Sequence, residues 1–392
     1  MWIEREVKAR INRSAGSRPV VLLTGARQTG KSSLLKRLFP ECRYITFDYI
    51  RQVEAAKESP QQFLRQCDGP TILDEIQYVP ELFRELKIQV DKERDTYGKW
   101  IITGSQQFEL MEQVSESLAG RITVINLETL SAMELRKSKV ERTADFLWRG
   151  GYPELWSNPY LELEDFFENY LRTYIERDLK QIVEVKNLND FRRFFRVLAV
   201  RIGQLINYRD IAKDVGVADV TVKRWLHALE TGGLITLLPP FFANIGKRLV
   251  KAPKLYFNDH GLACYLLGIV EAETWSAHTH RGNLWENLVL MELIKNNHLL
   301  PGRELFFYRD QNGVEVDFII EQGNKITLLE AKSGEKVDNR KLNFKKIAPL
   351  LNEKYQIECV VAHSPLDDIV VELKNYKSYN PLKVNFIPFK QV

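Results

Sequence analysis

The chain of 392 residues has only four cysteines. Successive cysteines lie 25, 197 and 95 residues apart, so the sequence holds no Cys-x-x-Cys pair and no zinc-finger spacing. With so few and such distant thiols, a disulfide-stapled scaffold and a zinc module are both excluded.

Long apolar runs are also missing. No stretch approaches the roughly 18 apolar residues that mark a membrane-spanning helix. The first ten residues, MWIEREVKAR, are charged and lack the apolar core of a secretory signal. We therefore expect a cytoplasmic protein that does not contact a membrane.

The chain has little net charge of either sign. It carries 56 basic and 52 acidic side chains, a formal charge of +4, which is too small to mark the whole chain as a nucleic-acid binder. Residues 191–260 are different, because 12 basic and 5 acidic side chains give this segment a charge of +7. Any surface that attracts nucleic acid is therefore expected to be local. An apolar fraction of 44% excludes general disorder.

The pattern of apolar runs predicts an α/β fold for the first part of the chain. Up to about residue 130, short apolar runs alternate with segments of helical period, which is typical of a parallel sheet covered by helices on both faces. The predicted strands are Val20–Leu23, Tyr44–Phe47, Thr71–Leu73, Trp100–Thr103 and Ile122–Leu127.

The rest of the chain predicts two further domains. Residues 165–260 are expected to be mainly helical, whereas a helix, two alternating strands and further αβ segments after residue 282 predict a small α/β unit. We place the domains at residues 1–155, 156–281 and 282–392.

The first predicted strand leads directly into GARQTGKS, which satisfies the phosphate-loop pattern GxxxxGK[ST]. The glycines let backbone N–H groups face a phosphate, and the helix that begins at Lys31 adds its positive dipole end. Lys31 is expected to reach the β- and γ-phosphates, and Ser32 to offer a hydroxyl to Mg²⁺. The residues expected to bind the nucleotide are Gly25, Ala26, Arg27, Gln28, Thr29, Gly30, Lys31, Ser32 and Ser33.

Polar side chains follow the next strands as well. Asp74 ends the strand Ile72–Leu73–Asp74 and is expected to hold the Mg²⁺ shell, while Glu75 can orient the attacking water or accept its proton. Ser105, after another strand, can sense the γ-phosphate. Arg121 can stabilise the transferring phosphate, in its own subunit or across an interface of a homo-oligomer, although a plain surface arginine is the alternative. The base-reading Asn-Lys-x-Asp of GTPases is missing, which favours ATP.

The basic segment has the pattern of a helix-turn-helix. Asn207 is a predicted N-cap, Gly216 ends the first helix, and a second helix opens near Asp219. Its polar face presents Thr221, Lys223, Arg224 and His227, and two later strands, at residues 234–238 and 255–257, are expected to form a wing. Basic residues placed between those strands are Lys247, Arg248, Lys251 and Lys254. Such a winged helix can contact DNA phosphates, or it can serve only as a packing or protein-contact module.

The last part of the chain carries a set of acids with one lysine. A mostly apolar helix at residues 283–296 includes Glu286, and a hairpin follows with Asp317 on its first strand. Alternation places Glu330 and Lys332 on one face of the second strand. Carboxylates of this kind can hold a divalent ion while the lysine stabilises a leaving charge, as in a metal-dependent phosphodiesterase. The alternative is a solvated Glu330–Lys332 pair.

Taken in order, these motifs resemble a prokaryotic family of AAA+-like ATPases whose carboxy-terminal half is catalogued as domain of unknown function 4143. The matching segments are GARQTGKS, ILDEIQ, ITGS, LAGR, residues 150–154, the helix around Trp285–Asn287, EVDF and LLEAK. The resemblance implies an ATPase core, a winged helix and a restriction-endonuclease-like domain of the PD-(D/E)XK type, although Val316 stands where the nuclease name expects proline.

The resemblance also implies roles for single residues. Lys31, Ser32, Asp74 and Glu75 would take the Walker roles, and Ser105 and Arg121 sensor or finger roles. Asp317, Glu330 and Lys332 would form the nuclease motif, with Glu286 as its helical acid.

Three hypotheses follow. The first is an ATP- and Mg²⁺-dependent protein that acts on DNA and possesses a metal-dependent nuclease-like domain, in which Asp317, Glu330 and Glu286 bind the ion. The second is an ATP-dependent switch or DNA-binding regulator whose nuclease-like domain does not cut. The third is an ATPase that remodels a protein partner through its helical middle.

Overall fold

The computed structural model describes residues 1–104, 117–138, 145–174, 188–242, 251–334, 342–363 and 377–382, together with residues 337 and 340. The chain divides into two compact units. The first holds Met1–Leu130, Tyr152–Ser157 and Thr231–Gly233, and the second holds the remainder. The predicted domain boundaries near residues 155 and 281 stay predictions.

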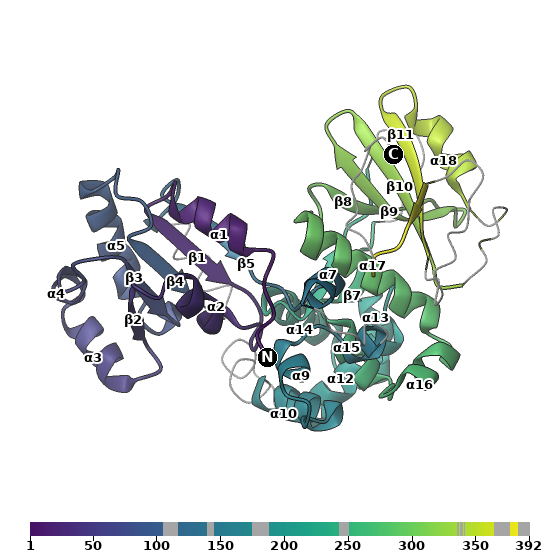
Figure 1. The fold of residues 1–392 in the computed structure, drawn as a ribbon. Coiled ribbons are helices and arrows are strands. Elements are labelled where there is room, and N and C mark those ends of the chain that lie inside the picture. The colour runs from purple at the N-terminus through teal and green to yellow at the C-terminus, as the bar shows by residue number, and fades with distance from the viewer. Residues whose placement is uncertain are drawn as a thin grey trace. The chain divides into compact units, whose positions relative to one another are not determined.

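Five parallel strands form the sheet of the first unit (Figure 1). They are β1 (Val20–Thr24), β2 (Arg43–Thr46), β3 (Thr71–Asp74), β4 (Trp100–Thr103) and β5 (Ile122–Asn126), in the order β2-β3-β4-β1-β5. The predicted strands and the parallel sheet of the α/β fold are confirmed. Because all five strands run the same way, the loops after β1, β3 and β4 leave the sheet at the same edge.

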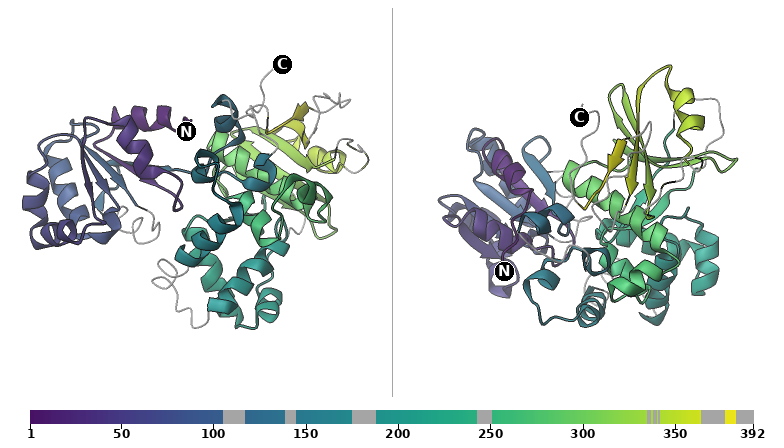
Figure 2. Two further views of the ribbon diagram at one scale, coloured as in Figure 1. Left: turned by 60° about the horizontal axis from the view of Figure 1, so that its bottom comes forward. Right: turned by 45° about the vertical axis from the view of Figure 1, so that its right-hand side comes forward.

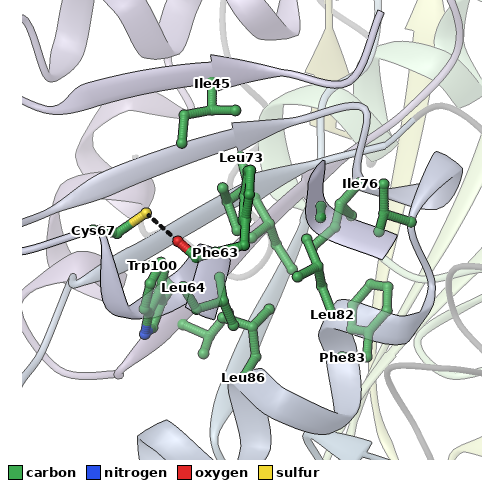
Figure 3. Packing of buried hydrophobic residues seen from close by; sticks show 14 of the residues in the cluster. Ile45, Phe63, Leu64, Cys67, Leu73, Ile76, Leu82, Phe83, Leu86 and Trp100 are labelled. Carbon is green, nitrogen blue, oxygen red and sulfur yellow. Dashed lines mark hydrogen bonds between the residues drawn. The ribbon is translucent and has the colours of Figure 1, made fainter. Parts of the chain in front are cut away.

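Helices cover both faces of this sheet. The helical elements of the first unit are α1 (Lys8–Ala15), α2 (Lys31–Leu38), α3 (Ile50–Glu58), α4 (Pro60–Arg65), the 3₁₀ turn η1 (Ile76–Tyr78) and α5 (Glu81–Lys92), and α9 (Pro153–Ser157) is grouped with this unit without being placed on the sheet. Val21 and Leu23 of β1 pack in one apolar cluster with residues of α1 and α2, whereas Val20 and Leu22 belong to a second cluster with residues of α4 and α5. Figure 3 shows the second cluster, where Leu86 of α5 and Leu64 of α4 lie beneath the strands. Each fully buried side chain of this size contributes roughly 1.5–3 kcal/mol, so the sheet is anchored from both sides.

The second unit begins with a helical region. Its helices are α7 (Ala132–Lys137), α8 (Phe146–Arg149), α10 (Leu163–Tyr174), α12 (Leu188–Val200), α13 (Tyr208–Val215), α14 (Asp219–Thr231), α15 (His260–Leu266) and α16 (Ala272–Ala277). Trp225 of α14 packs edge-on against Phe191 and Phe194 of α12, with ring centroids 4.9 and 5.2 Å apart. Strands β6 (Ile235–Leu238) and β7 (Lys254–Phe257) form an antiparallel pair. The predicted helices and the pairing of these two strands are confirmed.

The second unit ends in a mixed sheet, seen from two further sides in Figure 2. Its elements are α17 (Arg281–Asn297), β8 (Leu305–Arg309), β9 (Glu315–Gln322), β10 (Lys325–Lys332), α18 (Phe344–Leu351), β11 (Gln356–His363) and β12 (Lys377–Tyr379). The strand order is β12-β11-β10-β9-β8, in which β8, β9 and β10 are antiparallel neighbours while β10, β11 and β12 run parallel. The predicted hairpin of β9 and β10 is confirmed.

Helix α17 is enclosed by the second unit on most of its surface, and ten of its side chains are buried. Seven of these side chains are apolar and the other three are Asn287, Glu292 and Lys295, so the helix belongs to the core of the unit rather than to its surface. Among the helices of the described segments, none has both the length and the apolar character needed to cross a membrane.

Candidate functional site

The predicted phosphate loop lies between the end of β1 and the start of α2. Gly25 has a φ of +137°, and a Cβ placed there would lie 2.3 Å from the carbonyl oxygen of Leu127, so only glycine fits. Gly30 has a φ of +91° and caps the N-terminus of α2, which begins at Lys31 as predicted. The loop therefore ends at the positive end of a helix dipole, where backbone N–H groups can receive phosphate oxygens.

Side chains hold this loop in place. The Lys31 Nζ is buried and donates to the carbonyl oxygens of Gly25 (3.0 Å) and Ala26 (2.8 Å). Thr29 donates its hydroxyl to the same Ala26 oxygen at 3.0 Å. Arg5 donates to the carbonyl oxygens of Thr29 (2.9 Å) and of Glu128 (2.6 Å), and so ties the loop to the segment after β5. Arg5 is a positioning residue that the sequence motif did not reveal.

The carboxylate of Asp74 is the meeting point of the site. It accepts hydrogen bonds from the Ser32 hydroxyl, at 2.8 Å to Oδ1 and 3.0 Å to Oδ2. Thr103 of β4 donates to Oδ1 at 2.5 Å, and Tyr44 of β2 donates to Oδ2. The two strands that flank β3 thus each supply one hydroxyl to the acid between them. Ser32 and Asp74 offer the hydroxyl and carboxylate oxygens that Mg²⁺ prefers, so the residues present fit this ion.

Tyr44 extends the site toward α2. Burial and the neighbouring Asp74 carboxylate raise the pKa of the Tyr44 hydroxyl, so it stays a hydrogen-bond donor at neutral pH. The Lys36 ammonium lies 3.9 Å from the centre of the Tyr44 ring. Neither residue belongs to a motif, and only the pairing of β2 with β3 brings Tyr44 to Asp74.

Glu75 follows Asp74 in an unusual backbone conformation. Its φ of +58° lies in the left-handed region, which a glutamate adopts only when its surroundings hold it there. Its backbone N–H donates to the Thr103 hydroxyl at 3.0 Å, and its carboxylate accepts a hydrogen bond from Gln77. Thr103 therefore fixes both acids, through the side chain of Asp74 and the backbone of Glu75.

Arg121, another predicted ATPase residue, is not brought to this site. Arg121 precedes β5, and its backbone oxygen accepts from the first residue of β1, so it lies at the sheet edge opposite the phosphate loop. Its side chain binds Asp91 through Nε (2.7 Å) and Nη2 (3.0 Å). This position argues against a finger role within its own subunit, so the role across an interface and the plain surface arginine are the two predictions that stay. Ser105 lies outside the described residues.

The basic segment folds as two helices joined at Gly216. Asn207 caps α13 by accepting from the backbone N–H of Arg209 at 3.1 Å, and Gly216 ends this helix with a φ of +84°. On α14, Lys223 and Arg224 are exposed and Thr221 is half-buried, while the apolar face with Val222 and Trp225 is buried. The predicted split between an apolar and a basic face is thus present. Lys247 and Arg248 lie outside the described residues.

The prediction that Lys254 belongs to a basic wing on the surface is wrong. Its side chain is only 1% exposed, and its Nζ binds the carboxylates of Glu286 (2.8 Å) and Glu315 (2.5 Å). It therefore belongs to the interior of the second unit. The sequence pattern counted it as a surface charge because lysine usually is one.

The predicted acids of the last domain lie around two lysines. The register of β9 and β10 pairs Phe318 with Leu329, which places Asp317 across from Glu330. Lys332 binds Glu330 at 2.5 Å and Asp317 at 3.6 Å, and the backbone N–H of Ala331 donates to Asp317 at 2.8 Å. We call Glu286, Glu315, Asp317, Glu330, Lys254 and Lys332 the carboxylate cluster.

Charge and burial oppose each other in this cluster. Burial raises the pKa of Glu330, and the nearby Asp317 raises it further. Burial also raises the pKa of Glu286, although Lys254 acts in the opposite direction. Burial alone would lower the pKa of Lys254, but the carboxylates of Glu286, Asp317 and Glu315 raise it overall. Lysine and acid thus stabilise each other's charged form inside the protein.

The three-acid metal site expected from the sequence is not assembled. Within the described part of the chain, no three His, Cys, Asp or Glu side chains come together in a way that could hold a metal ion. Including Glu286 with Asp317 and Glu330 is therefore wrong for this geometry, because Glu286 faces Lys254 and the hydroxyl of Tyr256 (2.5 Å) instead. Asp317 and Glu330 alone still fit an Mg²⁺ ion that keeps several waters.

Three family models match the chain. An AAA domain matches residues 17–136, a domain of unknown function, DUF8612, matches residues 140–273, and another, DUF4143, matches residues 281–376. The DUF4143 match thus covers α17 and strands β8 to β11 of the second sheet, and does not extend over the helix pair as the resemblance implied. With the phosphate loop, the AAA match supports ATP binding and hydrolysis by the first unit.

Among curated proteins, two mycobacterial proteins are similar to this chain. Uncharacterized protein Mb2031c of Mycobacterium bovis and Uncharacterized protein Rv2008c of Mycobacterium tuberculosis are each 36% identical over 328 residues, or 82% of this chain and 72% of theirs. Solved structures with some likeness include the Walker-type ATPase PABY2304 of Pyrococcus abyssi, with 17% identity, a TM-score of 0.43, and coverage of 68% of this chain and 96% of that one. A RuvB variant of Thermotoga maritima has 15% identity, a TM-score of 0.32, and coverage of 60% and 90%.

We predict that Thr103→Val lowers the kcat of ATP hydrolysis by about tenfold to a hundredfold, because valine keeps the shape but loses the hydrogen bonds to Asp74 and Glu75. Steady-state phosphate release at varied ATP concentrations measures kcat and KM separately, and KM should change less. Thr103→Ser keeps the hydroxyl and should stay close to the wild-type kcat. A Thr103→Val protein that hydrolyses ATP at the wild-type rate would contradict the role given to Thr103.

Proposed function

The chain belongs to the same family as the mycobacterial proteins Mb2031c and Rv2008c and carries an AAA domain and a DUF4143 domain. We propose that it is an Mg²⁺-dependent ATPase that acts on DNA. The observation that carries the ATPase part is the contact of Ser32 with Asp74. It joins the phosphate loop of β1 to the acid of β3 at 2.8 Å, the arrangement needed to serve one nucleotide.

The residues of the first unit have distinct roles in this proposal. The N–H groups at the start of α2 and the Lys31 ammonium bind the β- and γ-phosphates of ATP. Glu75 accepts a proton from the water that attacks the γ-phosphorus, while the bond from that phosphorus to the bridging oxygen breaks and ADP leaves. Ser32 and Asp74 would hold Mg²⁺, which neutralises phosphate charge when bound. Thr103 and Tyr44 keep Asp74 in place.

Two features of the second unit support an action on DNA. The helix pair α13–α14 presents Lys223 and Arg224 to solvent on one face, as phosphate contact by a winged helix requires. The carboxylate cluster has the groups of a PD-(D/E)XK-type phosphodiesterase. Asp317 and Glu330 would hold one divalent ion there, which polarises a phosphodiester when bound, and the Lys332 ammonium can stabilise the charge on the leaving oxygen.

Two functions are alternatives to DNA cleavage, namely a non-cutting switch and the remodelling of a protein partner. The four acids of the carboxylate cluster are already paired with lysines and backbone groups, which favours a nucleotide-dependent switch whose nuclease-like domain does not cut. A homo-oligomer in which Arg121 reaches the nucleotide of a neighbouring copy is a further proposal. Remodelling of a protein partner is the alternative if the helix pair contacts no DNA.

We predict that Glu75→Gln lowers the rate of ATP hydrolysis by about 10²- to 10³-fold, because the amide cannot accept the proton of the attacking water. Its affinity for ATP should stay within a fewfold of wild type, since Glu75 is not assigned to phosphate binding. Phosphate release and a fluorescent-nucleotide titration measure the two quantities. Hydrolysis at the wild-type rate would remove Glu75 from its proposed role.

DNA binding is tested by reversing charge on α14. Lys223→Glu with Arg224→Glu should weaken binding of duplex DNA and reduce the slope of log affinity against log salt by about two, as expected for two lost phosphate contacts. Lys345→Glu with Lys346→Glu, two exposed lysines of α18, is the matched control. If both double variants bind DNA like wild type, the protein-partner hypothesis gains support.

We predict that metal-dependent cleavage of plasmid DNA is lost in Asp317→Asn and in Lys332→Ala, because one removes an ion ligand and the other the charge beside the leaving oxygen. Gel analysis with Mg²⁺ or Mn²⁺, with and without ATP, measures this. Glu321→Gln, at the far end of β9, is the control. An absence of nicking by the wild type under every condition favours the non-cutting switch.

A further inference from the structure

Lys254 reaches the carboxylate cluster from β7, outside the DUF4143 segment. We infer that Lys254 is a fixed counter-ion that closes one side of the cluster, so that Glu286 and Glu315 bind this ammonium instead of a divalent cation. The cluster then accepts a single divalent ion, at Asp317 and Glu330. The statement that one divalent ion binds at Asp317 and Glu330 rests on the proposed function, whereas the pairing of Lys254 with Glu286 and Glu315 does not.

The contacts of Lys254 are direct and multiple. Its Nζ lies 2.8 Å from Oε1 of Glu286 on α17 and 2.5 Å from Oε1 of Glu315 on β9. The same Glu286 oxygen accepts the Tyr256 hydroxyl at 2.5 Å, and the other Glu315 oxygen accepts from Arg309 at 2.9 Å. Oε1 of Glu286 and both carboxylate oxygens of Glu315 are therefore engaged by donors of the protein itself.

The backbone keeps this ammonium where it is. Lys254 pairs with Leu238 of β6 and forms a bridge with Leu205, so β7 is held from both sides. The Nζ lies 5.6 Å from the centre of the Phe307 ring, and the residue is only 1% exposed. Moving the charge to solvent would require this strand to leave its neighbours.

The other lysine of the cluster is different. The side chain of Lys332 is 31% exposed, so it can turn toward water when Asp317 and Glu330 bind another cation. A divalent ion on Glu286 would instead lie within a few ångströms of a buried ammonium that cannot withdraw, and like charges at such a distance repel strongly. The two lysines thus divide the cluster into a closed side and an open side.

The test measures the thermal unfolding temperature of the full chain without nucleotide, with and without MnCl₂. An ion that binds only the folded state raises this temperature, and the rise grows with the ratio of the ion concentration to its dissociation constant. We expect Glu286→Gln to show the same Mn²⁺-dependent rise as wild type, and Asp317→Asn to lose it. Glu292→Gln, another buried acid of α17, is the matched control. A smaller rise in Glu286→Gln, with Glu292→Gln unchanged, would overturn the inference because it would make Glu286 an ion ligand.

A second arm separates this inference from the proposed function. If wild type shows no Mn²⁺-dependent rise, the divalent site at Asp317 and Glu330 is wrong, and the role of Lys254 is decided by charge removal alone. Lys254→Met should lower the unfolding temperature or prevent folding, because it leaves two acids without their counter-ion. Adding Glu286→Gln and Glu315→Gln to Lys254→Met should restore much of the loss. A triple variant no more stable than Lys254→Met would overturn the inference.

Discussion

The structure of the nucleotide site depends on how one helix and two strands converge on one carboxylate. Asp74 is the last residue of β3, and the phosphate loop follows β1. Ser32, Thr103 and Tyr44 bring hydroxyls from three different elements to the two carboxylate oxygens of Asp74. Hydrogen bonds to a charged acceptor are stronger than those between neutral groups, so each contributes to fixing the acid. The same hydroxyl of Thr103 accepts a hydrogen bond from the backbone N–H of Glu75. One side chain therefore positions both Asp74, which would hold the ion, and Glu75, the proposed base for the attacking water. An aspartate free to rotate would satisfy the sequence motif without this geometry.

Much of the first unit could be predicted because its signals are local. The strands are continuous apolar runs, and Gly25 and Gly30 are required by a turn with positive φ that few other residues adopt. Thr103 and Tyr44 could not be found in this way, because their role depends on which strands are neighbours in the sheet. Strand order is a non-local property, and no motif records that β4 lies between β1 and β3. The role of Arg121 within its own subunit could not be judged from the sequence for the same reason. Arg121 lies beside the first residue of β1, whereas the phosphate loop follows the last, so the length of β1 separates them.

The second unit depends on α17 as its common support. The side-chain amide of Asn287 accepts from the backbone N–H of Phe257 in β7 at 2.7 Å and donates to its carbonyl oxygen at 2.9 Å. Trp285 donates to the carbonyl of Ala362 in β11 at 3.2 Å. Glu292 caps the start of α7 by accepting from the N–H of Ala132 at 3.2 Å. Burial raises the pKa of this glutamate to about 7, although Lys295 acts against the shift.

The sequence indicated that α17 is an apolar helix with an acid, Glu286, that needs a partner. The partner, Lys254, lies more than thirty residues away and was assigned to the surface. Buried charge is the feature that composition and periodicity describe least well, because it depends on contacts between distant segments.

The central claim is that the loop after β1 binds the triphosphate of ATP through Lys31 and the start of α2. Isothermal titration calorimetry with Mg²⁺ and a non-hydrolysable ATP analogue tests it directly, in wild type and in Lys31→Ala. The account predicts one analogue bound per wild-type chain and an affinity at least tenfold lower in the variant, because a charge-assisted contact to phosphate contributes about 1.5–3 kcal/mol. Equal affinity in the two proteins, or no binding by folded wild type, would contradict it.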